Sequence, residues 1–342
     1  MNNNKAYNSI NCLKIVFSLM IVLMHTGATY GYPFGNLNII RNIYSYGGMY
    51  GNYFFFICSG FFNALRYADG ISENSITCEQ FMKRRIAKVY PVYFCASVVQ
   101  VILLVREGSI LTVKELILNI LLITTGWIED TYPFVFPAWF FSQLIICYLV
   151  FYLITKYGKN KKILLYILAI IGGYIILIAD YKIPFLYRHD GEGLCSFFVG
   201  VMLCQIHRVF IRQNILIKAK ILIGVVIMGI VGLTMLGVVS LGTDIVFECI
   251  FVYFPCLFIM LSNSFFDGKL KAIGDLMSGI SIYIFLWHIP IDKLYRLLTN
   301  NTGAYKWYML ILCLFSYISY KVKVFEMIKI GLKRYSSKYG KL

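Results

Sequence analysis

Charged residues are scarce in this sequence, and it contains no hydrophilic stretch long enough to form a soluble domain. Only 14% of the 342 residues are Asp, Glu, Lys or Arg, compared with roughly 25% in soluble domains. Acidic residues are the scarcer kind, with 16 Asp and Glu against 32 Lys and Arg. No linker or low-complexity block divides the chain, so we expect a single domain over residues 1–342.

Cysteine motifs are also missing, although the sequence has ten cysteines. None forms a CxxC pair, and their spacing is unlike that of a zinc site. Their positions along apolar stretches predict small buried side chains, so we expect neither a disulfide framework nor a bound metal. The basic residues behind the net charge of +16 lie in short loops and in the C-terminal segment. That placement is typical of the cytoplasmic loops of membrane proteins and argues against nucleic acid as a partner.

Apolar runs, by contrast, recur from one end of the chain to the other. Hydrophobic residues make up 59% of the sequence, and its mean hydropathy is +0.73. A backbone in lipid must satisfy its hydrogen bonds internally, which predicts an all-α, polytopic integral membrane helical bundle. We expect about ten transmembrane helices, at residues 12–28, 47–66, 87–105, 137–155, 163–179, 193–208, 219–238, 246–262, 277–293 and 305–322. A further stretch, 115–126, is too short to cross and predicts one re-entrant or interfacial helix.

The charged residues predict the orientation of these spans. With the N-terminus inside, the cytoplasmic segments are basic: 67–86, 156–162, 209–218, 263–276 and the tail 329–342. The outer loops 106–136 and 180–192 carry much of the acidic charge, and counting 115–126 as a full span would invert every later loop. The start of the chain has no small-residue cleavage site, which predicts that 12–28 is retained. We therefore expect a multi-pass protein of the cell (plasma) membrane with both termini cytoplasmic.

Lys14 and His25 are polar residues inside the first predicted span. They are eleven residues apart, about three helical turns or 16 Å, and therefore project from nearly the same face. Ser18 lies on the same stripe. The alternative is a Lys14 side chain that snorkels to the interface and a structural His25 bonded to a neighbouring helix. Three aligned polar groups favour a functional stripe, because ionisable residues inside membrane spans mostly mark function.

The span 47–66 repeats the pattern. Asn52, Ser59 and Asn63 lie at i, i+7 and i+11, and Arg66 follows three residues later. The alternative explanation is hydrogen bonding between helices, which is common in membrane bundles.

The span 277–293 places Ser281 and His288 seven residues apart and therefore on one face. Pro290 frees a backbone carbonyl nearby and predicts a kink. The alternative for His288 is an interfacial position beside Trp287.

A basic turn opens the span 87–105, with Arg84, Arg85 and Lys88 at the membrane surface. From charge alone a lipid headgroup anchor is favoured over a phosphate clamp, although the arginine fork suits phosphate well.

Trp139 and Gln143 share a face near the outer surface, and an aromatic belt residue with a packing amide is the alternative to a binding role. His207, among arginines, predicts a solvated interfacial residue, and His189 lies in an outer loop without an assigned role.

Six motifs, in this order, resemble the membrane acyltransferases of the acyltransferase 3 family. They are the Lys14–His25 pair, "FFFICSGFF", "RRIAKVYPVY", "PAWFFSQL", "SFFVGVML" and "SIYIFLWHIP", and together they extend over nearly the whole chain. The chain departs from the family at three positions. Lys14 and Lys88 stand where Arg is usual, and Tyr53 stands where many members carry Asp.

The resemblance implies an O-acyltransferase that moves an acyl group, most often acetyl, from cytoplasmic acyl-CoA to a hydroxyl of a cell-surface or lipid-linked polysaccharide. Its partners would be the lipid bilayer, acetyl-CoA as donor, the glycan acceptor and polysaccharide-biosynthesis proteins, with no metal.

The resemblance also suggests which residues act. His25 and His288 would be catalytic, with His25 as a general base or a covalent acyl relay, because a buried imidazole favours its neutral form. The expected acetyl-CoA ligands are Arg84, Arg85, Lys14 and Lys88, and the expected substrate-binding residues are Asn52, Ser59 and Trp139.

Two functions from other classes remain open at this point. One is a transporter for a small polar solute. The sequence shows no detectable inverted repeat and no pair of broken helices, which argues against this function. The other is a non-catalytic subunit of a polysaccharide export complex.

Overall fold

The computed structural model describes residues 7–129, 131–212, 225–226, 229, 232–233, 244–261 and 271–322, and every regular element in these ranges is a helix. The α-helices are α1 (Asn8–Thr26), α2 (Asn38–Ser72), α3 (Cys78–Arg106), α4 (Val113–Leu121), α5 (Trp139–Tyr157), α6 (Lys162–Ala179), α7 (Arg188–Arg212), α9 (Ile245–Phe247), α10 (Phe254–Leu261), α11 (Lys271–Leu298) and α12 (Tyr305–Val322). Short 3₁₀ turns η1 (Ala28–Tyr30), η2 (Phe136–Ala138) and η3 (Lys159–Lys161) and a π-helical turn η4 (Glu248–Tyr253) complete them. The predicted all-α class is confirmed.

Every predicted span overlaps a described helix except 219–238, most of which lies outside the described residues. By length and apolar composition, five of the described helical segments could cross a membrane: Asn8–Thr26, Cys78–Arg106, Phe136–Tyr157, Lys159–Ala179 and Ala272–Leu298. The predicted number of about ten is therefore not confirmed. The long helices α2 and α7 fall outside this set because glycine, asparagine and charged residues dilute their apolar residues.

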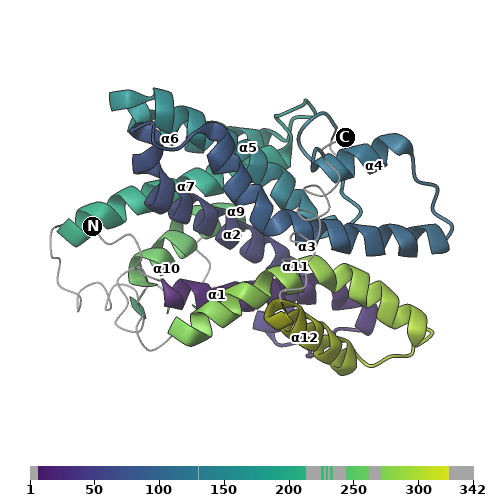
Figure 1. The fold of residues 1–342 in the computed structure, drawn as a ribbon. Coiled ribbons are helices and arrows are strands. Elements are labelled where there is room, and N and C mark those ends of the chain that lie inside the picture. The colour runs from purple at the N-terminus through teal and green to yellow at the C-terminus, as the bar shows by residue number, and fades with distance from the viewer. Residues whose placement is uncertain are drawn as a thin grey trace.

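Helices α1 and α11 run in the same direction and stay in register. Three hydrogen-bonded pairs with nearly the same sequence offset join them: Lys14–Ser278, Ser18–Ser281 and His25–His288. The two helices lie side by side in Figure 1, and α12 also packs against α11. We call the two ends of this pair the Lys14 end and the His25 end.

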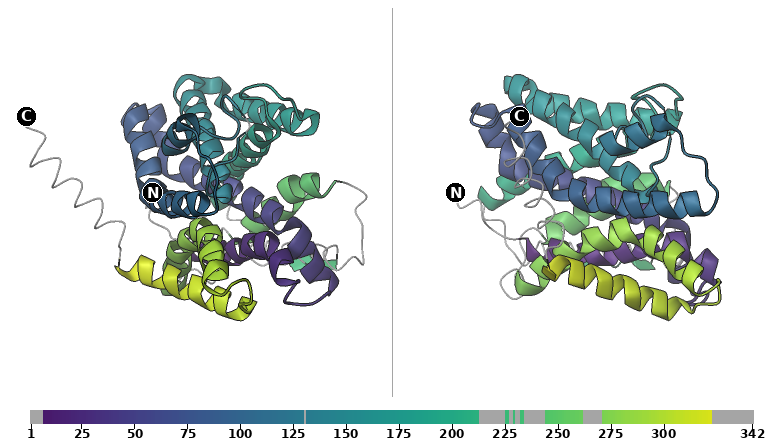
Figure 2. Two further views of the ribbon diagram at one scale, coloured as in Figure 1. Left: turned by 90° about the vertical axis from the view of Figure 1, so that its right-hand side faces the viewer. Right: turned by 45° about the vertical axis from the view of Figure 1, so that its right-hand side comes forward.

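The other helices alternate in direction, so their connections gather at the same two ends. The contacts Ser72–Thr155 and Asp69–Arg208 join α2 to α5 and α7 at the Lys14 end. The contacts Glu107–Lys293 and Tyr132–His189 lie at the His25 end. The predicted cytoplasmic segments 67–86 and 156–162 thus lie at one end, and the predicted outer loops 106–136 and 180–192 at the other. Figure 2 shows the bundle from two further sides.

Peripheral helices expose apolar side chains, whereas central ones bury theirs. Exposed residues on α6 follow helical spacing: Ile163, Leu164, Ile167, Leu168, Ile171, Ile175 and Ile178. Such a continuous apolar face is costly in water and is typical of contact with lipid. The centre of the bundle is instead filled by aromatic residues, among them Phe54, Phe56 and Phe61, which are almost completely buried.

Helix α4 occupies the stretch that was predicted as a short re-entrant or interfacial helix. Thr112 and Glu115 form a capping box at its start, and the Thr112 backbone N–H and hydroxyl lower the pKa of Glu115 by hydrogen bonding to its carboxylate. Tyr90 and Tyr93 of α3 donate hydrogen bonds to the last turn of α4. With 9 residues, α4 is too short to cross a bilayer.

Glycine allows α2 and α7 to touch at the backbone. A Cβ added at Gly60 would overlap the carbonyl oxygen of Phe197, and one added at Gly200 would overlap the carbonyl oxygen of Ile57. Small residues at such crossings let membrane helices approach closely. This crossing sets the position of the middle of α2.

We expect Gly60→Ala to destabilise the protein by about 1–3 kcal/mol, because the new methyl group must push two backbones apart. The measurement is the apparent melting temperature in detergent. The control is Gly172→Ala, since a Cβ at Gly172 meets no atom within 4 Å. An apparent melting temperature of Gly60→Ala equal to or above that of the wild type would contradict the close backbone contact between α2 and α7.

Candidate active site

Two histidines from distant parts of the sequence meet at the His25 end. The His25 Nδ1 and His288 Nε2 atoms are 2.8 Å apart, and the planes of the two rings differ by only 8°. His288 is completely buried, whereas His25 is half-buried. We call this pair the histidine dyad. Its accessible member is His25.

The backbone of α11 fixes the proton positions in the dyad. The Nδ1 atom of His288 lies 2.9 Å from the Phe285 carbonyl oxygen and 3.2 Å from that of Ile284. Carbonyl oxygens only accept hydrogen bonds, so this nitrogen carries a proton. In a neutral dyad the Nε2 atom of His288 must then accept a hydrogen bond from the Nδ1–H group of His25. The Nε2 atom of His25 is left with its lone pair, as a general base requires.

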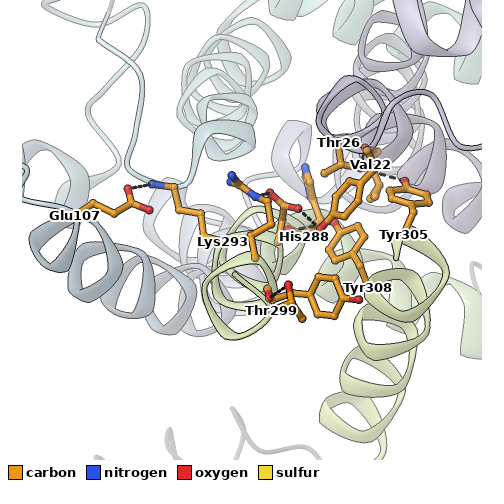
Figure 3. Close-up of polar contacts among 12 residues, drawn as sticks. Val22, Thr26, Glu107, His288, Lys293, Thr299, Tyr305 and Tyr308 are labelled. Carbon is orange, nitrogen blue, oxygen red and sulfur yellow. Dashed lines mark hydrogen bonds and ion pairs between the residues drawn. The ribbon is translucent and has the colours of Figure 1, made fainter. Parts of the chain in front are cut away.

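Tyrosines of α12 support the dyad from behind. Tyr308 donates a hydrogen bond of 3.1 Å to the backbone oxygen of His288, and the hydroxyls of Tyr305 and Thr26 are 3.1 Å apart. Figure 3 shows these side chains between α1, α11 and α12. The contacts hold α1 and α11 at a fixed separation where the histidines meet.

A buried carboxylate, Asp292, lies one helical turn beyond His288. It accepts hydrogen bonds from Tyr30 at 2.9 Å and from the Arg296 guanidinium at 3.0 Å. Burial, followed by the neighbouring Asp292 carboxylate, raises the pKa of Tyr30, so its hydroxyl remains a donor. Asp292 therefore joins the loop after α1 to α11.

Four cations from three helices gather at the Lys14 end: Lys14, Arg66, Arg85 and Lys88. Lys14 interacts electrostatically with Arg66 and Lys88, and Lys88 does so with Arg66 and Arg85. Lys14 and Arg66 also lie over the same ring, that of Phe62, at 5.2 and 5.6 Å from its centroid. We call these four residues the basic cluster.

No carboxylate among the described residues forms an ion pair with a member of the basic cluster. Lys14 donates instead to two neutral oxygens, Asn11 Oδ1 at 2.8 Å and Ser278 Oγ at 3.1 Å. Arg85 donates to the Tyr67 hydroxyl and lies over its ring. Like charges held together without counter-ions repel one another, so the cluster favours a bound anion with several charges.

Arg84 does not join the basic cluster. It is exposed on α3 and forms no hydrogen bond or ion pair with a described residue. Adjacent residues of a helix project about 100° apart, so only one of two neighbouring arginines can face Lys14 and Lys88. The structure thus brings Lys14, Arg85 and Lys88 together, adds Arg66 and leaves Arg84 outside.

The predicted substrate-binding residues lie apart from one another. The Ser59 hydroxyl is 3.0 Å from that of Tyr148 and 3.3 Å from the Asn63 amide nitrogen. Asn52 is half-buried two turns of α2 nearer the His25 end. Trp139 is buried at the His25 end, where its ring lies 4.3 Å from that of His189.

The geometry combines an imidazole whose Nε2 can act as a base with a cluster of cations that can bind an anion. A comparison with known families gives the class of protein. A family model described as an acyltransferase domain matches residues 7–320. The chain belongs to the acyltransferase 3 family. No curated protein and no solved structure matches it. Family membership and the apolar helices make this chain a membrane protein of the acyltransferase class, and the matched range includes the dyad and the basic cluster.

The sequence patterns assign no role to several residues that complete this candidate site. Tyr67 and Tyr148 bond to Arg85 and Ser59, and nothing in their spacing distinguishes them from the other tyrosines. Phe136, whose ring meets that of His25 edge to face at 5.5 Å, lies in an outer loop rich in aromatic residues. The density of aromatic residues in that loop is the sequence feature that could have pointed to Phe136.

The hydrogen-bond pattern predicts that both dyad imidazoles carry their proton on Nδ1. We expect solid-state NMR of the protein in lipid, with ¹⁵N-labelled histidine, to show a protonated Nδ1 and a bare Nε2 for His25. His25→Ala and His288→Leu assign the signals, and His207→Gln, which changes the histidine bonded to Tyr7, leaves them unchanged. A protonated Nε2 on His25 in the wild type would contradict the assignment.

Proposed function

We propose that this protein is a membrane O-acyltransferase that moves an acyl group, acetyl in the simplest case, from acyl-CoA to a hydroxyl of a cell-surface or lipid-linked polysaccharide. One observation carries the proposal. The basic cluster and the histidine dyad lie at opposite ends of the same pair of parallel helices, α1 and α11. The eleven residues from Lys14 to His25 correspond to a separation of about 16 Å along the helix axis.

The basic cluster suits the phosphates of a CoA donor. Arg66 and Lys88 are exposed and open to a charged nucleotide, whereas Lys14 is half-buried further along α1. Arg85 offers the planar donor fork that matches phosphate oxygens. The pantetheine arm of CoA is thin and uncharged, so it can extend between helices towards the dyad while the nucleotide stays at the Lys14 end.

The dyad suits transfer to a hydroxyl. His25 Nε2 takes the proton of the acceptor hydroxyl while the hydroxyl oxygen forms a bond to the carbonyl carbon of the thioester. The carbon–sulfur bond then breaks, and the CoA thiolate leaves and takes the proton back from His25. His288 stabilises the transient imidazolium because its Nε2 lone pair accepts from the His25 Nδ1–H group. In the alternative covalent route, His25 Nε2 attacks the thioester carbonyl carbon, the carbon–sulfur bond breaks and CoA leaves as the thiolate. The acceptor hydroxyl oxygen then attacks the acyl carbon, the carbon–nitrogen bond to His25 breaks, and the hydroxyl proton passes to the thiolate.

The basic loops support one orientation of the protein in the cell membrane. Acyl-CoA is made in the cytoplasm, so the Lys14 end would face it, with both termini on that side. The His25 end would face outwards, where the acceptor glycan and the proteins that assemble it are found.

We expect His25→Ala to lower acyl transfer by about 10²- to 10⁴-fold, the usual contribution of a general base. Inside-out vesicles with the wild type or the variant, at equal expression, receive acetyl-CoA labelled on the acetyl group, and the glycan and lipid fractions are counted. Transfer that survives in His25→Ala contradicts the mechanism. A wild type that neither transfers label nor is stabilised by CoA favours the transporter or the export-complex subunit.

We expect substitution of the two neighbouring arginines, Arg84 and Arg85, to change the KM for acetyl-CoA by different factors. We expect Arg85→Ala to raise the KM for acetyl-CoA about 10- to 100-fold, because charge-assisted hydrogen bonds to phosphate are lost. Arg84→Ala removes the same charge outside the basic cluster. It should raise the KM for acetyl-CoA less than about 3-fold, because an exposed charge contributes only a weak surface interaction. Lys161→Ala, at the same end, is the control for loss of one surface charge. Equal increases in the KM for acetyl-CoA in Arg84→Ala and Arg85→Ala would contradict the assignment of Arg85, and not Arg84, to the basic cluster.

A further inference from the structure

Both histidines of the dyad lie at weak points of their own helices. His25 is the second-to-last residue of α1, and the last turn of a helix lacks part of its hydrogen bonding and frays. His288 lies two residues before Pro290, which interrupts the hydrogen bonds inside α11 because proline has no backbone N–H group. The helices alone therefore do not fix the 2.8 Å contact between His25 Nδ1 and His288 Nε2, which needs support from other residues.

Tyr30 supplies such support from the turn η1 that follows α1. Its hydroxyl donates a hydrogen bond of 2.9 Å to Asp292 Oδ1. Tyr30 comes five residues after His25, and Asp292 comes four residues after His288. Residues four apart on a helix share a face and are separated by about 6 Å along the axis. The bond therefore joins the chain at the end of α1 to α11 one helical turn beyond the contact between the two imidazoles.

Asp292 is a strong acceptor for this bond. Its side chain is buried, and its second oxygen, Oδ2, accepts a hydrogen bond of 3.0 Å from Arg296 Nε. A buried carboxylate is costly unless its oxygens are hydrogen-bonded, and hydrogen bonds to a charged group are stronger than those between neutral groups. Loss of the Tyr30 hydroxyl would leave Asp292 Oδ1 without a partner among the described residues.

The ring of Tyr30 packs against the two tyrosines of α12 that support the dyad. It stacks on Tyr308, with an interplanar angle of 13° and centroids 5.7 Å apart, and meets Tyr305 edge to face at 5.0 Å. Tyr308 donates to the backbone oxygen of His288, and the Tyr305 hydroxyl bonds to that of Thr26, as Figure 3 shows. These contacts hold the Tyr30 ring in the orientation that its bond to α11 requires.

We propose that Tyr30 and Asp292 are positioning residues of the histidine dyad. Their hydrogen bond holds the end of α1 on α11, so that the Nδ1–H group of His25 stays directed at the Nε2 atom of His288. Without the bond, the last turn of α1 moves away from α11 for part of the time, and His25 loses the partner that stabilises its imidazolium. The effect of this loss on catalysis rests on the proposed function, whereas the effect on the dyad contact does not.

The test is Tyr30→Phe, which keeps the ring and its packing on α12 and removes only the hydroxyl. Solid-state NMR of the full chain in lipid, with ¹⁵N-labelled histidine, should show a scalar coupling between His25 Nδ1 and His288 Nε2 in the wild type. We expect this coupling to fall about twofold or more in Tyr30→Phe, because a lost hydrogen bond to a charged group favours the open dyad. Tyr90→Phe is the control, since it removes a tyrosine hydroxyl bond between α3 and α4.

Acetyl transfer gives a second measurement on the same variants. We expect kcat to fall about 10- to 100-fold in Tyr30→Phe while the KM for acetyl-CoA stays within about 2-fold, because the basic cluster lies at the other end of α1. Asp292→Asn keeps the size of the side chain and weakens the same hydrogen bond. The double variant should therefore lose less activity than the product of the two single losses, as expected for residues that act through one contact.

The positioning role would be overturned by a coupling that is absent from the wild type or unchanged in Tyr30→Phe, and by single losses of kcat that multiply in the double variant. A lower apparent melting temperature of Tyr30→Phe, with coupling and kcat unchanged, would also overturn it, because Tyr30 would then contribute only to stability. A wild type that transfers no acetyl group, with the coupling reduced in Tyr30→Phe, would instead remove the proposed reaction and leave the positioning role standing.

Discussion

The register between α1 and α11 is the constraint on which the rest of the site depends. Three polar pairs with offsets of 263 or 264 residues hold the two helices parallel. A shift by one residue would rotate each polar side chain by about 100° and leave it against apolar neighbours, where an unpaired polar group is costly. The polar pairs therefore favour one alignment, and that alignment places the basic cluster and the dyad at opposite ends.

Much of this arrangement could be predicted from the sequence, because helical periodicity shows which residues share a face. The stripe of Lys14, Ser18 and His25 is such a case, and all three face α11. Periodicity within one helix does not show which residue of another helix lies opposite. The contact between His25 and His288 therefore cannot be predicted from the sequence, and neither can which of the two neighbouring arginines, Arg84 or Arg85, faces Lys14. Both depend on how helices are rotated against one another by packing.

Length and apolar composition identify only five of the described helical segments as able to cross a membrane, and the reason is a different physical one. Hydropathy measures how well a segment tolerates lipid, and α6, with its exposed isoleucines, meets that criterion. Helix α2 is surrounded by other helices and carries Gly47, Gly51 and Gly60 where neighbouring backbones approach. Close packing between helices favours small and polar residues there, which lower the hydropathy of a segment without exposing it to water. Length and apolarity thus omit a glycine-rich central helix such as α2, although they include the half-buried segments Phe136–Tyr157 and Ala272–Leu298.

The two halves of the site place opposite demands on their surroundings. Four cations without a carboxylate partner among the described residues need water or an anion nearby, and Arg66 and Lys88 are accordingly exposed. A base that works through a bare imidazole nitrogen needs the reverse, a position away from other cations and a partner such as His288 that is fully buried. No single location in a membrane protein meets both demands. Under the proposed function, the length of α1 reconciles them, because only the uncharged part of the donor has to travel along it.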